Sequence, residues 1–130
     1  MSVKALLFDW GDTLMRDDKS RNDAMYLWPE VQAIDGAEKT LRELSKTFTI
    51  SVATGAAQSD EKMVRKALQR VGLDGFVSSV FTGRNTGMQK TDPGFWLHIQ
   101  RQLKAEACEL LIVGDSFESD VLTPTKAGLA

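Results

Sequence analysis

Apolar residues occur along this chain in short continuous runs that are separated by longer segments of mixed polarity. Four runs are rich in β-forming residues and end abruptly at a small or polar residue; they cover residues 3–8, 48–53, 76–81 and 109–113. Continuous apolar runs of this length are typical of parallel strands that are buried on both faces. The pattern therefore predicts four strands of a parallel sheet.

Between these runs, apolar residues recur at helical spacing. The spacing predicts helices over residues 36–47, 59–71 and 92–104, and a short last helix over 118–130 with Pro124 near its beginning. Ser59 is the expected N-cap of the second helix, and Gly72 the residue that ends it. Residues 83–91 are expected to form a loop. Alternating strands and helices indicate an α/β, three-layer, Rossmann-like fold.

The polar stretch over residues 16–35 has no clear helical period and is expected to be a loop or flap. It carries Tyr26 and Trp28, which could cover a site near the end of the first strand. The interpretation we favour is that the two aromatic side chains pin this loop to the body of the protein, because buried aromatic residues usually serve packing.

Composition narrows the class of protein. The chain has 130 residues, 42% of them hydrophobic and 26% charged, and its length and lack of a linker predict a single domain over 1–130. The net charge of −2 gives no sign of a nucleic-acid partner, and no apolar segment is long enough to span a membrane. The one cysteine, Cys108, is expected to fill space in the core and to favour a reducing, cytoplasmic location.

Polar side chains stand at successive strand ends. Asp9, Thr54 and Asp115 follow three of the predicted strands, and Lys90 lies on the loop after the remaining one. Parallel strands end at the same edge of a sheet, so these groups should meet in one crevice. Two carboxylates, with Asp120 close by, suit Mg²⁺, and a hydroxyl and an ammonium group suit a phosphoryl group. A carboxylate can also serve as a nucleophile in phosphoryl transfer.

Four motifs in these places resemble those of the haloacid dehalogenase-like (HAD) hydrolase superfamily. FDWGDTL is similar to its first motif, SVATG to its second, GMQKTDP with Lys90 to its third, and VGDSFESD to its fourth. The four stand in the family's order and span residues 8–120. The resemblance implies a magnesium-dependent phosphohydrolase (phosphatase) that acts on a phosphorylated small molecule or on an exposed group of a macromolecule.

The resemblance also implies roles for individual residues. Asp9 would be the nucleophile, which becomes an aspartyl-phosphate, and a magnesium ligand. The backbone carbonyl of Gly11 and the carboxylate of Asp115 would be further ligands, and Asp120 would act through water or as a support. The phosphoryl group would be held by Thr54, Gly55 and Lys90.

The chain departs from the family pattern in three respects. The family's general acid and base stands two residues after the nucleophile, where this chain has Gly11, so we consider Asp12 as a substitute. No segment is long enough for a sizeable cap, which resembles the capless branch. The family continues into a further strand after an AGL-like sequence, whereas this sequence ends at residue 130. We therefore expect a truncated chain whose fourth strand has an unpaired edge, and this edge could drive formation of a homodimer.

Other classes of protein remain open at this stage. The main alternative is a catalytically impaired regulatory module that keeps the metal and phosphate site but lacks the acid/base at Gly11. A response-regulator receiver is disfavoured because its acceptor stands on a mid-chain strand. A P-loop is disfavoured because Lys90 does not directly follow Gly87. A halide-displacing enzyme would have no need for Asp115 and Asp120.

Overall fold

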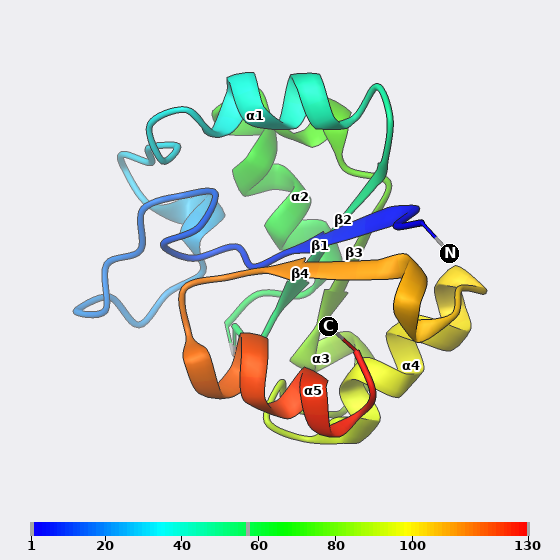
Figure 1. Cartoon of the computed structure of the whole chain (residues 1–130). Coiled ribbons are helices and arrows are strands. Elements are labelled where there is room, and N and C mark those ends of the chain that lie inside the picture. Colours follow the sequence, from blue (N-terminus) through cyan, green and yellow to red (C-terminus); the bar gives the residue numbers. More distant parts are fainter. Residues whose placement is uncertain (1, 57, 130) are drawn as a thin grey trace.

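A four-stranded parallel sheet lies at the centre of the protein, with the strand order β3-β2-β1-β4 (Figure 1). The computed structural model describes residues 2–56 and 58–129. The strands are β1 (Ala5–Phe8), β2 (Thr49–Thr54), β3 (Ser79–Thr82) and β4 (Leu110–Val113). In the register, Phe8 of β1 lies opposite Val52 of β2 and Val113 of β4. The predicted parallel sheet is confirmed.

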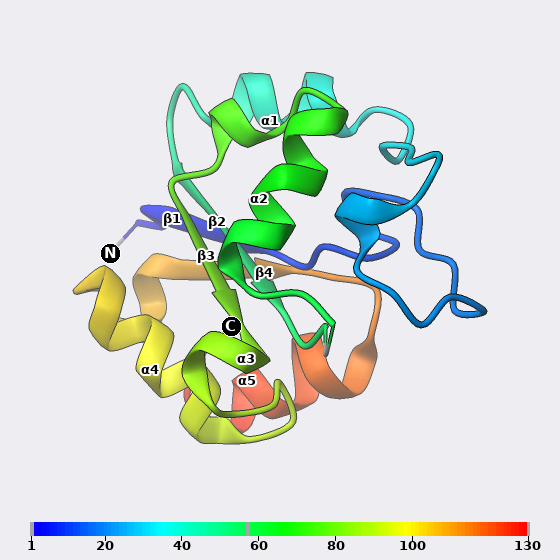
Figure 2. The ribbon, with the colours of Figure 1, turned by 180° about the vertical axis from the view of Figure 1, so that it is seen from behind.

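Helices cover both faces of the sheet. They are α1 (Ala37–Leu44), α2 (Glu61–Arg70), α3 (Gly83–Thr86), α4 (Pro93–Leu103) and α5 (Thr123–Lys126). In Figure 1, α1 and α2 lie above the sheet while α4 and α5 lie below it, and Figure 2 shows the same division from behind. The expected three-layer α/β architecture is confirmed.

Two hydrophobic clusters, one on each face, hold these layers together. Because side chains alternate along a strand, Leu6 and Phe8 of β1 enter the cluster beneath α1 and α2. Ala5 and Leu7 enter the other cluster, together with Phe95 and Trp96 of α4. Burial of β1 on both faces explains why its sequence is a continuous apolar run.

Two predicted boundaries are wrong for local reasons. The N-cap of α2 is Asp60 rather than Ser59, because the Asp60 carboxylate accepts a hydrogen bond from the backbone N–H of Met63. The third strand begins at Ser79, later than expected, because Asp74–Phe76 forms a 3₁₀ turn. Asp60, like Ser59, is a residue type that caps helices, and Phe76 is apolar like the residues of β3, so the sequence did not distinguish them.

Two further segments also differ from expectation. The region 83–91 was expected to be a loop, but it contains the short helix α3, capped by the side chain of Thr82. The last segment is helical, as expected, but its first part is a π-helical turn, Glu118–Leu122, which passes directly into α5, and the helical segment ends at Lys126.

The flap over residues 16–35 is pinned to the body of the protein, as favoured from the sequence. Trp28 is buried, and its indole N–H donates to the backbone carbonyl of Asp23 at 3.1 Å. Arg70 of α2 donates to the carbonyls of Tyr26, Trp28 and Pro29. One 3₁₀ turn, Met25–Leu27, interrupts the flap, and no larger cap is found between β1 and α1.

β4 forms one edge of the sheet in the part of the chain that the structure describes. Leu111 and Val113, which lie on the α1/α2 side of the sheet, are 41% and 36% exposed. Cys108, expected in the core, is instead exposed just before this strand. Within residues 2–56 and 58–129, no helix has the length and apolar character needed to cross a membrane.

Candidate functional site

The polar strand ends converge as the topology requires. Asp9 directly follows β1, and its backbone N–H donates to the carbonyl of Val113 at the end of β4 at 2.8 Å, which fixes the two strand ends beside each other. A hollow of about 280 Å³ opens at this edge of the sheet. Its lining consists of Asp9, Trp10, Gly11, Asp12, Asp17, Lys19, Met25, Thr54, Gly55, Ala56, Asp115 and Ser116.

Asp9 is held in one orientation by three donors. Its Oδ1 accepts from the backbone N–H of Trp10 at 2.8 Å and from Nζ of Lys90 at 3.1 Å. Its Oδ2 accepts from the Thr13 hydroxyl at 3.4 Å. Burial is the main cause that raises the pKa of Asp9 to about 7, and a hydrogen bond with Asp115 adds to it, while Lys90 acts in the opposite direction.

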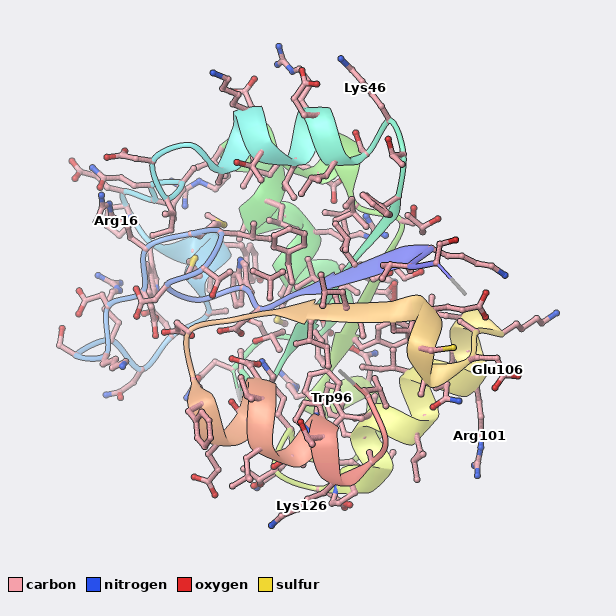
Figure 3. The ribbon with its side chains drawn as sticks, viewed as in Figure 1. Arg16, Lys46, Trp96, Arg101, Glu106 and Lys126 are labelled. Atoms are coloured by element: carbon pink, nitrogen blue, oxygen red, sulfur yellow. The ribbon has the colours of Figure 1, made fainter. Side chains whose placement is uncertain are left out.

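Lys90 reaches the site although it comes from a loop far along the chain. It is buried and forms ion pairs with both Asp9 and Asp120. The Trp96 indole N–H donates to the backbone carbonyl of Lys90 at 2.8 Å, and the Lys90 ammonium lies 5.8 Å from the centre of the Trp96 ring. Figure 3 shows Trp96 in the interior, whereas Lys46, Arg101 and Lys126 point away from the body. Trp96 therefore anchors the lysine from α4.

Asp120 is buried behind the site and organises the loop after β4. Its Oδ2 accepts from the backbone N–H of Ser116 at 3.1 Å. Gly114 makes room for this carboxyl group, since a Cβ atom at residue 114 would lie 2.2 Å from Oδ2 of Asp120. The Asp120 carboxyl group is therefore packed against the backbone at Gly114 and Ser116, on either side of Asp115.

Three carboxylates come together closely enough to share one cation. Single oxygens of Asp9, Asp115 and Asp120 lie within 4.8 Å of one another. Hard divalent cations such as Mg²⁺ prefer oxygen ligands of this kind. A cation there would also favour the charged form of the Asp9 carboxylate, which burial disfavours. The donor set therefore fits a hard divalent metal ion.

Thr54 and Gly55 lie at the end of β2. Thr54 is buried, and its hydroxyl accepts a hydrogen bond from the backbone N–H of Ala56 at 3.2 Å. A Cβ at Gly55 would lie 3.6 Å from the aliphatic stem of Lys90, so glycine leaves space beside that side chain. Both residues line the hollow that also contains Asp9.

Gly11 and Asp12 begin a tight loop after β1. Asp12 has the left-handed φ of 59°, and its carboxylate accepts from the backbone N–H of Asp17 at 3.0 Å. The Asp12 side chain thus holds the returning segment. Gly11 lies in the hollow, and its open side faces Asp17.

Sequence reasoning missed three residues of this site. Trp96 orients Lys90, Gly114 accommodates Asp120, and Asp17 lies against Gly11. A glycine directly before Asp115 was a usable signal for a close approach. No local pattern indicated Asp17 or Trp96, because each reaches the site through tertiary packing.

The chain belongs to the haloacid dehalogenase-like hydrolase family, whose model matches residues 10–130. Among curated proteins it is 27% identical over 100 residues to the ribulose-1,5-bisphosphate 5-phosphatase of Halopiger xanaduensis. That match covers 77% of this chain but only 41% of the relative, so the chain spans about two fifths of that protein's length.

Solved structures show the same fold. An uncharacterised protein from Listeria monocytogenes serotype 4b has a TM-score of 0.90 at 23% identity, with 98% of this chain and 75% of that chain covered. The Bacillus subtilis protein YfnB, described as a HAD-hydrolase and solved with magnesium bound, has a TM-score of 0.80 at 19% identity, with 99% and 85% covered. At these identities the likeness concerns the fold.

Proposed function

We propose that this protein is a magnesium-dependent phosphohydrolase that acts through a phosphorylated Asp9. The observation that carries this proposal is the position of the Asp9 carboxylate, fixed by three donors at the carboxyl end of the sheet, in a hollow with Thr54, Gly55 and Asp115. The similarity to a phosphatase for ribulose-1,5-bisphosphate supports a phosphorylated small molecule as the substrate class.

The reaction would proceed in two displacements. In the first, an oxygen of Asp9 attacks phosphorus, the bond to the leaving oxygen breaks, and an aspartyl-phosphate forms. In the second, water attacks the same phosphorus, which releases inorganic phosphate and restores the carboxylate. Thr54 and the Lys90 ammonium would hold and neutralise the phosphoryl oxygens as charge develops.

The metal would be held by Asp9, Asp115 and the backbone carbonyl of Gly11, with Asp120 as the support. Once bound, Mg²⁺ would supply positive charge to the phosphoryl oxygens and to the carboxylates. Asp120 would keep Lys90 and the loop at Ser116 in position, which are the contacts it makes in the structure.

A catalytically impaired regulatory module is the second candidate. It is favoured by Gly11, which cannot move a proton, and by the use of the Asp12 carboxylate to hold the backbone N–H of Asp17. Such a module would bind the metal and a phosphoryl group but would release phosphate slowly or not at all.

Release of phosphate separates the two candidates. We expect the wild-type chain with Mg²⁺ to release phosphate from p-nitrophenyl phosphate and acetyl phosphate, and Asp9→Asn to lose this activity, since the amide is no nucleophile. Asp35→Asn, which changes an exposed carboxylate away from the hollow, is the matched control. Magnesium binding without phosphate release would favour the regulatory module.

A homodimer and a cytoplasmic location belong to the same proposal. The dimer is supported by the edge position of β4 and by its exposed apolar side chains. The location is supported by the single cysteine, which leaves no partner for an internal disulfide.

A further inference from the structure

The leaving oxygen of a phosphate monoester needs a proton as its bond to phosphorus breaks. Several acidic side chains line the hollow around Asp9, and most of them have other tasks in the proposed reaction. Asp9 is the nucleophile and Asp115 a metal ligand, while Asp12 holds a backbone N–H group. The remaining acidic side chain in the lining is Asp17.

Asp17 lies where a side chain at residue 11 would extend. A Cβ atom placed on Gly11 would lie 3.5 Å from Cβ of Asp17 and 3.6 Å from its Cγ and Oδ2. These are ordinary contact distances, so the Asp17 carboxylate fills the space in front of Gly11. Asp17 therefore brings a carboxyl group next to Gly11, the residue that stands two positions after the nucleophile Asp9.

The turn that follows β1 delivers Asp17 to this place. Gly11 forms a parallel bridge with Met15, and the N–H of Asp12 donates to the Met15 carbonyl at 2.7 Å, so residues 11–15 close into a tight loop. The Asp12 carboxylate then accepts from the N–H of Asp17 at 3.0 Å. Asp12 is thus a positioning residue for Asp17.

The next two acids along this loop, Asp18 and Asp23, are engaged elsewhere. Asp18 accepts from the N–H and the hydroxyl of Ser20, and Asp23 pairs with Arg21. Within residues 2–56 and 58–129, by contrast, no hydrogen bond or ion pair to the Asp17 carboxylate is found, although its backbone is fixed. The backbone of Asp17 is thus held in place, while its carboxylate, which lines the hollow, has no partner among the described residues, and this combination is suited to proton transfer.

We propose that Asp17 is the general acid and base of this site, a role that rests on the proposed phosphohydrolase function. As the P–O bond to the leaving group breaks, the oxygen departs with the electron pair and takes the proton of the Asp17 carboxyl group. The product alcohol leaves, and Asp17 remains as a carboxylate. In the second displacement this carboxylate accepts a proton from the attacking water, which restores the acid and yields inorganic phosphate.

The test measures the formation and breakdown of the aspartyl-phosphate in Asp17→Asn, with two phosphoryl donors. With β-glycerophosphate, whose alkoxide leaving group needs a proton, we expect formation to slow about 10²–10⁴-fold. With acetyl phosphate, whose leaving group needs little protonation, formation should stay within about threefold of wild type. Breakdown should slow in both cases, so phosphorylated protein should accumulate with acetyl phosphate.

Asp18→Asn is the matched control, since it changes the neighbouring carboxylate, and it should behave as wild type. A second variant combines Asp17→Asn with Gly11→Asp. It should regain turnover of β-glycerophosphate, because a side chain at residue 11 would extend toward residue 17 and supply a carboxyl group in the same place. This recovery also guards against a folding defect in Asp17→Asn.

Each outcome decides the inference. The role of Asp17 would be overturned if aspartyl-phosphate formation in Asp17→Asn were slowed equally with both donors, or were not slowed with β-glycerophosphate. The function of Asp9 would be unaffected by either result. If no donor gives Asp9-dependent phosphate release in the wild-type chain, the proposed function fails, and the role of Asp17 fails with it.

Discussion

At the scale of single residues, the Asp9 carboxylate makes the site costly to form without a cation. Burial raises the pKa of Asp9 to about 7, whereas an unfolded chain has an aspartate pKa of about 3.9. Between these two values the folded protein holds a proton that the unfolded chain has released. The free energy of unfolding should therefore decrease as the pH rises from about 4 to about 7, and this contribution should level off above 7.

Asp9→Asn should remove that contribution to the pH dependence. Without divalent cations, we expect the variant to be more stable than wild type at pH 8 and to gain this advantage across pH 4–7, with a slope difference of up to about 1.4 kcal/mol per pH unit. Urea unfolding at several pH values in EDTA measures the difference. Stability curves that run parallel for the two proteins would contradict the assignment.

The residues of the site differed in how far the sequence could predict them. Asp9, Thr54 and Asp115 were predictable because the ends of parallel strands meet at one edge, so position along the chain implies position in space. Asp17 was not predictable, because its approach to Gly11 depends on a tight loop in which Asp12 adopts a φ of 59°. No period in the sequence reports such a turn.

At the scale of elements, the loop between β4 and the π-helical turn depends on Gly114. In Gly114→Ala the new Cβ would overlap the Asp120 carboxyl group, so either the loop or Asp120 must move. We expect a loss of about 1–3 kcal/mol in the free energy of unfolding and a marked loss of magnesium-dependent turnover. Urea unfolding and phosphate release measure the two effects.

Gly75→Ala, in the 3₁₀ turn before β3, is the control for the effect of adding a methyl group to a glycine. Nothing lies within 4 Å of a Cβ at Gly75, and its stability should stay within about 0.5 kcal/mol of wild type. If Gly114→Ala were as stable and active as Gly75→Ala, the close packing of Asp120 against the loop would have no importance for the site.

The elements themselves followed from the sequence where burial on both faces left a continuous apolar run, as in β1 and β2. The predicted strand boundaries were wrong where apolar residues outside a strand pack against the core. Phe76 belongs to a 3₁₀ turn yet packs against the core, so it extended the predicted third strand too early. The π-helical turn at Glu118–Leu122 has no sequence period of its own and could not be distinguished from an α-helix.

At the scale of the whole molecule, the exposed edge of the sheet is the feature that bears on association. Most of the large apolar side chains found exposed lie on β4 or just after it: Leu111, Val113, Phe117, Val121 and Leu122. Pairing of this edge between two copies would bury them. We expect light scattering to give a mass near twice 14.4 kDa, whereas Leu111→Lys should be monomeric because its charge opposes burial.

Leu97→Lys serves as the control for association, because Leu97 is 39% exposed but lies on α4, away from the strand edge. This variant should keep the mass of the wild-type protein. A wild-type mass of one chain, or equal effects of both substitutions, would contradict pairing through β4. The assignment of residues 1–130 to a single domain stays a prediction.

Chemical trapping at residue 9 shows whether Asp9 accepts the phosphoryl group. The protein is incubated with acetyl phosphate and Mg²⁺, treated with borohydride to reduce any aspartyl-phosphate to homoserine, and digested for mass spectrometry. We predict homoserine at residue 9, with none when magnesium is withheld and none in the Asp9→Asn variant. Magnesium-dependent phosphate release with residue 9 unmodified, or with another aspartate modified instead, would show that Asp9 is not the nucleophile.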